Sequence, residues 1–520
     1  MAPQDSSPEE GQRASGAVWR WLAPDLAMAL ATLTLFTCLF LFGGSARLFR
    51  DSDTGWHVRT GEMILAEAAV PRSDPYSLTR SGQPWMAWEW ASDVAMGALH
   101  RAVGLRGVAW LYGLIIAASV WLWVRLSWTT GGDFLLTCAW MPWVWTTAGL
   151  HWLARPHLIG WVWLMLAVMA AERISVRFVP RHGWMAFVLA AAWANTHASF
   201  VLGFVVLALY ALGELTAWLL WKSGDLRRAR WYALVLLCAA PGTLLNPYGW
   251  ALHVHVFRYL RDTELLSRVA EFQSFNFHSD GAGAVLAVLL VTLAGAACAA
   301  AHRATGRSFV LLFFAVLAIR SARGLPLLAM CALPLANGSI TLALLRVREL
   351  RPIPQWALDG FLRYSGNLRK LDAGLRGWAV APLAAVAAWL ILSIPTVAAR
   401  SSFPRDEFPV DASARVAGLP RDARVLAPDK YGGYLIYRFA GERKVYFDGR
   451  SDFYGAEYMK AYLRLMEVRP GWRQQIRQFA FTHALLPVDA PLRAGLESSG
   501  WQIVYQDKVA VLLAAPPEWH

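Results

Sequence analysis

Eleven apolar stretches, each long enough to cross or nearly cross a lipid bilayer, constrain the fold of this chain more than any other feature. Hydrophobic residues make up 57% of the 520 residues and charged residues 16%, whereas soluble proteins carry about 25% charged residues. The sequence therefore predicts an α-helical polytopic membrane protein with about eleven transmembrane helices. The stretches cover residues 26–44, 107–126, 132–149, 157–172, 184–195, 199–221, 229–246, 282–301, 307–320, 323–345 and 377–398.

The basic residues of the connections orient these helices. If the N-terminus is cytoplasmic, the larger cytoplasmic connections are 173–181, 222–230, 302–307 and 346–376, and each is rich in Arg or Lys. This is the distribution that the positive-inside rule requires. Topology and anionic lipid also explain the formal charge of +13, so we expect membrane lipids and no nucleic acid among the partners.

Composition divides the chain into three regions. Residues 1–25 hold Pro, Ser, Glu, Gln and Gly and are expected to form a disordered cytoplasmic tail. Residues 26–400 form the transmembrane domain, and residues 401–520 have the composition of a soluble protein. Because an odd number of helices precedes it, this C-terminal domain should lie in the periplasm of a bacterium. The transmembrane domain would then be a multi-pass domain of the inner membrane.

The first outer loop, residues 45–106, is longer than a structureless connection normally is, so it should fold. Trp56, Thr60 and Ile64 share one face of a helix that we expect to lie on the membrane surface. Pro84 should open a second helix, because proline is favoured at the first helical position.

Sequence periodicity predicts a small α/β fold for the C-terminal domain. A closing hairpin is expected from residues 501–505 and 508–513, with its turn at Gln506 and Asp507. The other predicted strands are Ala423–Ala427, Tyr434–Phe439, Lys444–Phe447 and Ala484–Val488, and the predicted helices are Ala456–Val468 and Gly471–Phe481.

This topology places the unusual polar residues at one face of the membrane. Ionisable groups at membrane depth are costly and usually line an internal or watery site, so their convergence indicates function. They are Asp51, Asp53, His57, Glu89 and Asp93 in the first outer loop, Arg155 and His157 before the fourth stretch, Asn195 and His197 after the fifth, Glu271 in outer loop 247–281, and Arg320 and Arg323 between the ninth and tenth stretches.

Several of these residues also have a structural interpretation. Asp53 could cap a helix that starts at Thr54. Asp51 and Asp53 could share a divalent cation, although a lone Asp-x-Asp does not identify a metal site, and no cofactor is otherwise indicated. Arg320 and Arg323 could reach lipid headgroups, and His157 and His197 could be structural histidines.

Helix stability does not explain one of the acidic pairs. Glu89 and Asp93 lie four residues apart on one helical face, where like charges cost roughly 0.2–0.5 kcal/mol. Plain solvent exposure is the alternative.

Taken together, the residues offer carboxylates to take a proton from an acceptor and arginines to hold a phosphate leaving group. The guanidinium fork of Arg155 suits phosphate oxygens. The fitting reaction is group transfer from a lipid-linked donor. A transporter or flippase would instead need midplane polar groups and two related halves, neither of which the sequence shows. A non-catalytic scaffold that presents residues 401–520 would leave the carboxylates unexplained.

The chain resembles the GT-C glycosyltransferases, which also have a multi-span domain, an acidic motif in the first outer loop and a soluble C-terminal domain. It resembles bacterial GT-C-like membrane proteins more closely, over nearly the whole chain after residue 45. The matching stretches are Asp51-Ser-Asp-Thr-Gly-Trp-His57, Pro71-Arg-Ser-Asp-Pro-Tyr-Ser77, Pro84-Trp with Glu89-Trp, Arg155-Pro-His157, Trp193-Ala-Asn-Thr-His197, Asn246-Pro-Tyr-Gly249, Glu271-Phe-Gln-Ser274, Tyr431-Gly-Gly-Tyr434 and Val445-Tyr-Phe-Asp-Gly-Arg450.

The resemblance implies an inverting glycosyl transfer from a polyprenyl-phosphate-linked sugar to a lipid or glycan acceptor, with Asp51 or Asp53 as the base. Asp53 is our first choice, with Asp51 and Glu89 as alternates, and Arg155, Arg320 and Arg323 would bind the donor phosphate. His57, Asp93, His157, Asn195, His197 and Glu271 complete the expected substrate site.

One C-terminal segment is also similar to a known signature. Asp429-Lys-Tyr-Gly432, with Asp448 downstream, is similar to the signature of oligosaccharyltransferase catalytic subunits. The paired tryptophans of that signature are absent, because Ala427-Pro428 stands in their place, so recognition of an acceptor peptide is not implied.

Overall fold

The computed structural model describes residues 21–174, 177–347 and 350–519. The predicted disordered tail therefore lies almost wholly outside the described residues. At its end, Asp25 is buried and caps the first long helix, α2 (Leu26–Phe40), by accepting a hydrogen bond from the Met28 amide. The same carboxylate pairs with Arg125 at 2.5 Å.

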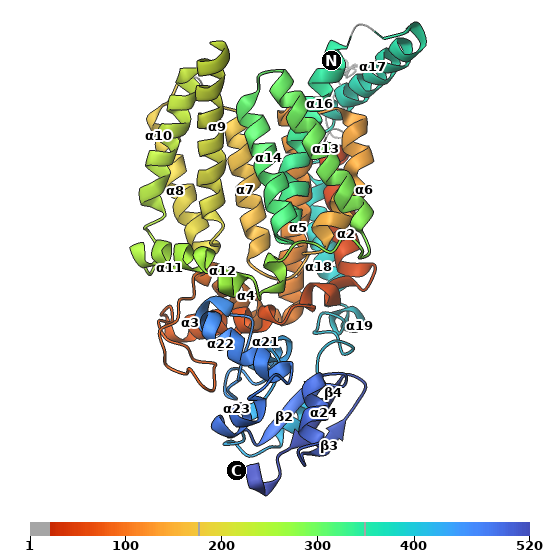
Figure 1. Cartoon of the computed structure of the whole chain (residues 1–520). Helices are drawn as coiled ribbons and strands as arrows, with labels where there is room; N and C mark the ends of the chain where they lie inside the picture. Colours follow the sequence, from red (N-terminus) through yellow and green to blue (C-terminus); the bar gives the residue numbers. More distant parts are fainter. Residues whose placement is uncertain (1–20, 175–176, 348–349, 520) are drawn as a thin grey trace, which may run out of the picture.

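Among the described residues, each of the eleven predicted stretches contains a long helix or an unbroken run of helices, and Figure 1 shows them standing side by side. The predicted polytopic α-helical fold is thus confirmed. Besides α2 they are α5 (Leu105–Thr129), α6 (Phe134–Gly149), α7 (His157–Glu172), α8 (Pro180–Thr196), α9 (Phe200–Trp221), α10 (Leu226–Gly242), α13 (Ala282–Ala301), α14 (Thr305–Arg320), the run α15 (Gly324–Leu327), η3 (Leu328–Ala332) and α16 (Leu333–Arg346), and α18 (Val380–Ser393).

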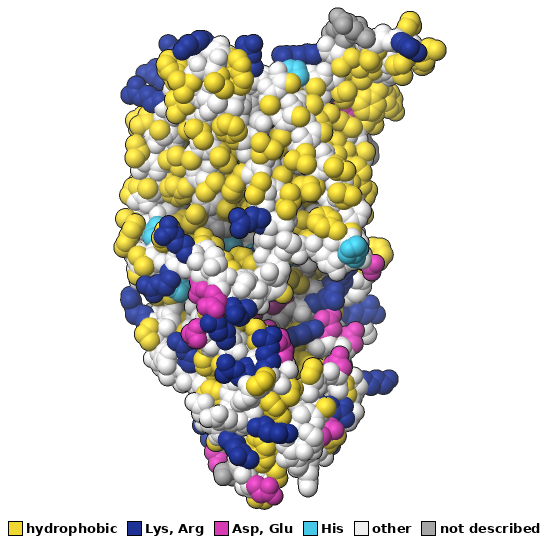
Figure 2. Space-filling view, viewed as in Figure 1, with side chains coloured by type: hydrophobic (Ala, Val, Ile, Leu, Met, Phe, Trp, Pro, Cys, Tyr) yellow, Lys and Arg dark blue, Asp and Glu magenta, His cyan; other side chains and the backbone are white. Residues whose placement is uncertain are grey.

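The surface of this bundle is that of a membrane protein. Figure 2 shows a broad belt of hydrophobic side chains between two charged ends. Leucine side chains are exposed on the outside of the bundle, such as Leu237 at 70% exposure. Exposing such apolar surface to water costs free energy, whereas contact with lipid does not. Within the described residues, four runs are both long and apolar enough to cross a bilayer. They are Leu105–Thr129, Phe200–Trp221, Ala282–Ala301 and Gly324–Arg346.

The two ends of the bundle differ in what covers them. One end, which we call the basic end, carries Arg173, Arg181, Arg228 and the helix α17 (Pro352–Gly374). The opposite end, which we call the sheet end, is covered by short helices and the C-terminal segment. These short helices are α3 (Asp53–Glu67), α4 (Trp90–Val103), α11 (Trp250–Arg261), α12 (Thr263–Leu266) and η2 (Ala270–Phe272).

Two expectations for the first outer loop were wrong. Pro84 does not open a helix: it forms an antiparallel bridge with Ser73, and α4 begins at Trp90. Helix α3 forms as expected, but Trp56, Thr60 and Ile64 are buried because α3 packs between α4 and a C-terminal helix, and the helix does not rest on the membrane surface with that face. Long-range packing decided both outcomes.

The C-terminal segment holds a four-stranded sheet in the order β1-β2-β4-β3. The β3–β4 pair is an antiparallel hairpin, as the sequence predicts, but Gln506 still pairs with Val511, so the turn is formed by residues 507–509 and not by Gln506 and Asp507. The strands are β1 (Val425–Leu426), β2 (His483–Pro487), β3 (Gln502–Gln506) and β4 (Ala510–Ala514). The helices of the segment are α19 (Pro395–Ala398), α20 (Ala412–Ala417), α21 (Asp429–Arg438), α22 (Ser451–Met466), α23 (Trp472–Gln478) and α24 (Pro491–Glu497).

Two predicted strands of this segment were wrong. Tyr434–Phe439 lies in or at the end of helix α21, and Lys444–Phe447 makes only one bridge, between Val445 and Ser77 of the first outer loop. Helix α21 packs against α3 at a very close backbone distance. A Cβ atom on Gly55 would lie 2.2 Å from the carbonyl oxygen of Gly433, so both positions need glycine.

A buried ion cluster also ties the two regions together. Arg450 pairs with Asp74 of the first outer loop at 2.7 Å and with Asp448 at 2.8 Å, and all three side chains are almost fully buried. Tyr454 donates a hydrogen bond to Asp448. These contacts place residues 449–452 directly over the sheet end of the bundle.

Candidate active site

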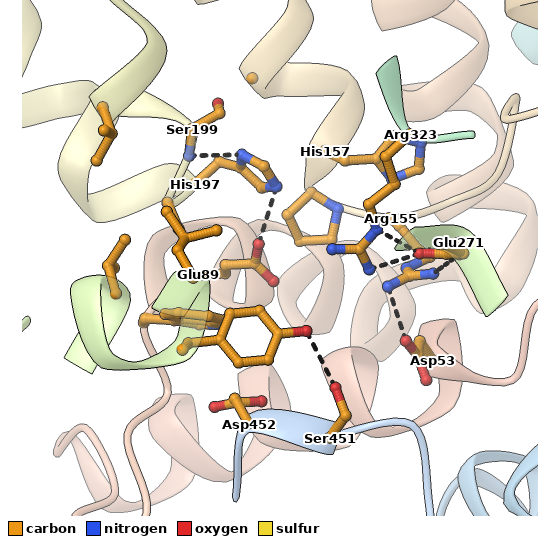
Figure 3. A pocket seen from close by; sticks show the side chains of 18 of the residues that line it. Asp53, Glu89, Arg155, His157, His197, Ser199, Glu271, Arg323, Ser451 and Asp452 are labelled. Carbon is orange, nitrogen blue, oxygen red and sulfur yellow. Dashed lines mark hydrogen bonds and ion pairs between the residues drawn. The ribbon is translucent and has the colours of Figure 1, made fainter. Parts of the chain in front are cut away.

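A cavity of about 310 Å³ lies at the sheet end, between the bundle, the first outer loop and residues 449–452 (Figure 3). Much of its wall is hydrocarbon, and charged side chains gather on one part of it. The apolar wall includes Trp88, Trp161, Leu164, Leu202, Leu317 and Leu327. The ionisable lining residues are Asp53, Glu89, Asp93, His151, Arg155, His157, His197, Glu271, Arg323, Arg450 and Asp452, together with the phenol of Tyr259.

Arg155 is the centre of the charged part. Its guanidinium lies 2.7 Å from Asp51, 2.8 Å from Asp53 and 3.0 Å from Glu271. Burial alone would lower the pKa of Arg155, but the three carboxylates raise it well above the usual value, so this side chain stays charged. Arg323 holds the other oxygen of Glu271 at 2.5 Å, so Glu271 bridges the two arginines.

Asp53 has a strongly raised pKa. Burial raises the pKa of Asp53 to about 7; Arg155 opposes the rise, and Asp51 and Glu271 add to it. The physical reason is that three carboxylates converge on Arg155, and Asp53 is the most buried of them. The expectation that Asp53 caps the helix was wrong, because Ser52 is the N-cap and Asp53 is the first residue inside α3.

Glu89 and Asp93 sit on either side of His57. His57 Nδ1 lies 2.6 Å from Asp93, and its Nε2 lies 3.6 Å from Glu89. Burial raises the pKa of Glu89 to about 8 and that of Asp93 well above its usual range, whereas burial and Arg155 lower the pKa of His57. Burial thus favours the neutral forms of these two carboxyl groups, and the imidazole of His57 lies between them.

Two further histidines line the cavity and have defined hydrogen bonds. Nδ1 of His197 accepts from the Ser199 amide, so its Nε2–H faces the Glu89 carboxyl at 3.2 Å (Figure 3). Nε2 of His157 lies 2.8 Å from the His151 carbonyl oxygen and must donate to it. Both rings are thus held in one orientation by their neighbours.

Comparison with solved structures identifies the architecture. AglB, the oligosaccharyltransferase of Archaeoglobus fulgidus solved with an inhibitory peptide and a dolichol-phosphate, matches 89% of this chain and 69% of its own. The TM-score is 0.50 at 9% sequence identity. The chain has the GT-C fold. ArnT of Cupriavidus metallidurans, bound to undecaprenyl phosphate, matches over 95% of this chain and 98% of its own, with a TM-score of 0.44 and 14% identity. No protein-family model and no curated protein matches the sequence.

The GT-C fold gathers most of the residues singled out in the sequence, but not all of them. Asp53, Glu89, Asp93, Arg155, His157, His197, Glu271 and Arg323 line the cavity. Asp51 and His57 do not line the cavity, but each contacts a residue that does: Asp51 pairs with Arg155, and His57 lies beside Glu89. Arg320 is exposed in the last turn of α14 and does not line the cavity. Ser321 is extended and ends that helix, and Arg323, which lies after this break at the start of α15, does line the cavity. Asn195 does not line the cavity either. Its side chain accepts a hydrogen bond from Trp90 and donates to the carbonyl oxygens of Ala191 and Leu245.

Sequence reasoning missed the contribution of the C-terminal segment. Ser451 and Asp452 line the cavity, and they hydrogen-bond to Tyr259 and His255 of α11. Gly449 approaches Asp53 directly. The Asp448-Gly-Arg450 stretch belongs to a motif that matches GT-C-like proteins, but none of the site residues expected from the sequence lies in the C-terminal domain.

The three carboxylates Asp51, Asp53 and Glu271 surround the side chain of Arg155. Among the described residues, no three His, Cys, Asp or Glu side chains are arranged to hold a metal ion. The carboxylates of Asp51, Asp53 and Glu271 lie 2.7, 2.8 and 3.0 Å from the guanidinium of Arg155, which occupies the position between them. The positive charge among these three carboxylates is the guanidinium of Arg155.

Proposed function

We propose that this protein transfers a sugar from a polyprenyl-phosphate donor to a lipid or glycan acceptor, in the periplasmic leaflet of a bacterial inner membrane. One observation carries the proposal: the cavity joins a carboxylate whose pKa is about 7 to two arginines and to an apolar wall. The shared fold with AglB, which was solved with a dolichol-phosphate, supports a lipid-linked donor.

The donor would be bound by its two chemically different ends. Its hydrocarbon would lie along the apolar wall, where Trp161, Leu164 and Leu202 offer carbon surface. Its phosphate would bind Arg155 and Arg323, which now share Glu271. The phosphodiester of the donor carries one negative charge, as Glu271 does, and offers several oxygens to the two guanidinium groups in its place. The leaving polyprenyl phosphate carries up to two negative charges, so the two arginines stabilise it more strongly than the donor.

Asp53 would act as the base. A general base is most effective when its pKa lies near the working pH, which describes Asp53 better than Glu89. In the proposed step, Asp53 takes the proton of the acceptor hydroxyl while the acceptor oxygen bonds to the anomeric carbon. The bond from that carbon to the phosphate oxygen breaks, and its electrons stay on the phosphate, where Arg155 and Arg323 stabilise the charge. The configuration at the anomeric carbon is inverted.

A transfer assay tests this assignment. Membranes that contain the full chain are given radiolabelled polyprenyl-phosphate sugar, and lipid-phase and glycan products are counted. We expect Asp53→Asn and Arg155→Ala to lower the rate at least about 100-fold. Arg320→Ala and Asp406→Asn are matched controls, because both side chains are exposed and outside the cavity. Undiminished transfer by the two site variants would refute the assignment.

A further inference from the structure

A second cavity of about 310 Å³ lies within the membrane belt and shares no lining residue with the candidate active site. It is enclosed by α7, α8, α9 and α10, which stand together at one side of the bundle in Figure 1. Helices α8 and α10 pack against each other, and α10 and α7 both pack against α9, which leaves a space between α7 and α8. Small side chains line much of this space: Ala167, Ala170, Ala186, Ala190, Gly203 and Ala239.

The side chains that line the interior of this cavity offer mainly apolar surface. Three tryptophans line it, and the indole N–H of each is already bonded elsewhere. Trp163 donates to Thr196, Trp193 to Ser199, and Trp231 to His182. A ligand inside therefore meets no free indole donor, so the part of it that fills the cavity must be hydrocarbon.

The cavity opens sideways toward the lipid belt. Met185 and Leu189 of α8 line it and are 55% and 43% exposed, and Leu166 of α7 lines it at 36% exposure. A side chain that both lines a cavity and faces outward marks a mouth. Protein interiors do not keep voids of this size, so a lateral opening in a bilayer admits a lipid chain.

Polar donors stand at one end of the same cavity, the basic end. Arg173 and His182 are its only ionisable lining residues within the described part of the chain. The guanidinium of Arg173 is exposed, is held to Thr129 by its Nε, and has no carboxylate partner among the described residues. Nδ1 of His182 accepts from Trp231, so its proton is on Nε2, which is a donor. A guanidinium and an N–H together suit a phosphate.

We propose that this cavity binds an anionic glycerophospholipid, with one acyl chain between α7 and α8 and the phosphate at Arg173 and His182. The site is separate from the proposed donor site, because the donor arginines are at the opposite end of the bundle. The bound lipid fills the space that the small side chains leave, and it joins the α8–α10 pair to the rest of the bundle.

Native mass spectrometry of the purified full chain tests the proposal. Delipidated protein is exchanged into bilayer discs of phosphatidylglycerol or phosphatidylcholine, and the lipid that remains bound after release is counted. We expect phosphatidylglycerol to be retained preferentially. Arg173→Ala should lower its retention about tenfold, and Ala167→Phe, which fills the cavity, should abolish it. Arg227→Ala and Ala208→Phe are the matched controls, since both side chains are exposed and line neither cavity.

Three outcomes would overturn the proposal. The first is retention by Arg173→Ala and Ala167→Phe equal to that of the unaltered protein. The second is equal retention of both phospholipids, which would remove the role of charge. The third is displacement of the bound phospholipid by decaprenyl phosphate with the same dependence on Arg173, which would make the cavity a carrier-lipid site. Because the readout is bound lipid, none of these depends on transfer activity.

Discussion

The backbone of Gly449 lies against the carboxylate of Asp53: a Cβ atom at this glycine would stand 1.9 Å from Asp53 Oδ1. The two residues are almost 400 positions apart in the chain. Residue 449 has no room for a side chain unless Asp53 moves. The C-terminal segment therefore forms one wall of the pocket around the proposed base.

Because of this contact, we expect Gly449→Ala to lower the rate of sugar transfer strongly. The new methyl group must push the Asp53 carboxylate away from its position, and a displacement of about 1 Å in a catalytic group costs roughly 100-fold in rate. Gly418→Ala is the matched control, since its Cβ would meet nothing closer than 3.5 Å. Radiolabelled transfer by both variants is the measurement. Equal rates would mean that Asp53 is not the base or is free to move.

The pH dependence of transfer should follow the ionisation of Asp53. Burial raises the pKa of Asp53 to about 7, and a base works only in its deprotonated form. The rate should therefore rise about tenfold per pH unit below pH 7 and level off above it. A rate measured from pH 5 to 9 checks this. A profile that is flat through pH 7 would contradict the role of Asp53.

Glu89 should tolerate an uncharged substitute. Burial raises the pKa of Glu89 to about 8, so its neutral form is favoured at pH 7. Glu89→Gln keeps the shape and an acceptor for His197, and we expect it to retain transfer within about threefold. Glu89→Ala removes the contact with both His57 and His197 and should reduce transfer further. A collapse of Glu89→Gln alone would favour Glu89 as the base.

Removal of Arg155 should turn the carboxylate cluster into a cation site. In Arg155→Ala, Asp51, Asp53 and Glu271 would face one another without the guanidinium, and loss of one partner of a buried ion cluster costs about 3–5 kcal/mol. We expect a lower unfolding temperature that millimolar Mg²⁺ or Mn²⁺ partly restores. Thermal unfolding with and without the metal is the test, with Arg320→Ala as the control. No metal effect in Arg155→Ala would show that the carboxylates separate instead.

The buried cluster of Arg450, Asp74 and Asp448 should matter for stability more than any surface pair. Arg450→Ala leaves two buried carboxylates without their cation and should destabilise the chain by about 3–5 kcal/mol. Arg405→Ala breaks the exposed pair with Asp411 and should cost no more than about 1 kcal/mol. Chemical unfolding of the purified variants gives both values. Similar values for the two variants would contradict the structural role of Arg450.

The membrane helices could be predicted from local sequence, but the secondary structure of Tyr434–Phe439 could not. The membrane helices were predictable because lipid forces each apolar stretch to satisfy its backbone hydrogen bonds within itself, as α9 and α13 do. The strand predicted at Tyr434–Phe439 failed for the opposite reason. Gly433 brings that segment into backbone contact with Ser52 and Gly55, and only a helix there packs against α3.

The sequence by itself determined that the chain is a polytopic helical protein, and it placed Asp53, Arg155 and Glu271 at the same end of the bundle. Hydrophobic length and charged connections are local properties, so a linear reading recovers them. Only the tertiary structure decided that Arg155 bridges three carboxylates, that Arg323 and not Arg320 reaches the cavity, and that Gly449 touches Asp53. These contacts depend on the docking of segments up to about 400 residues apart, which no local pattern records.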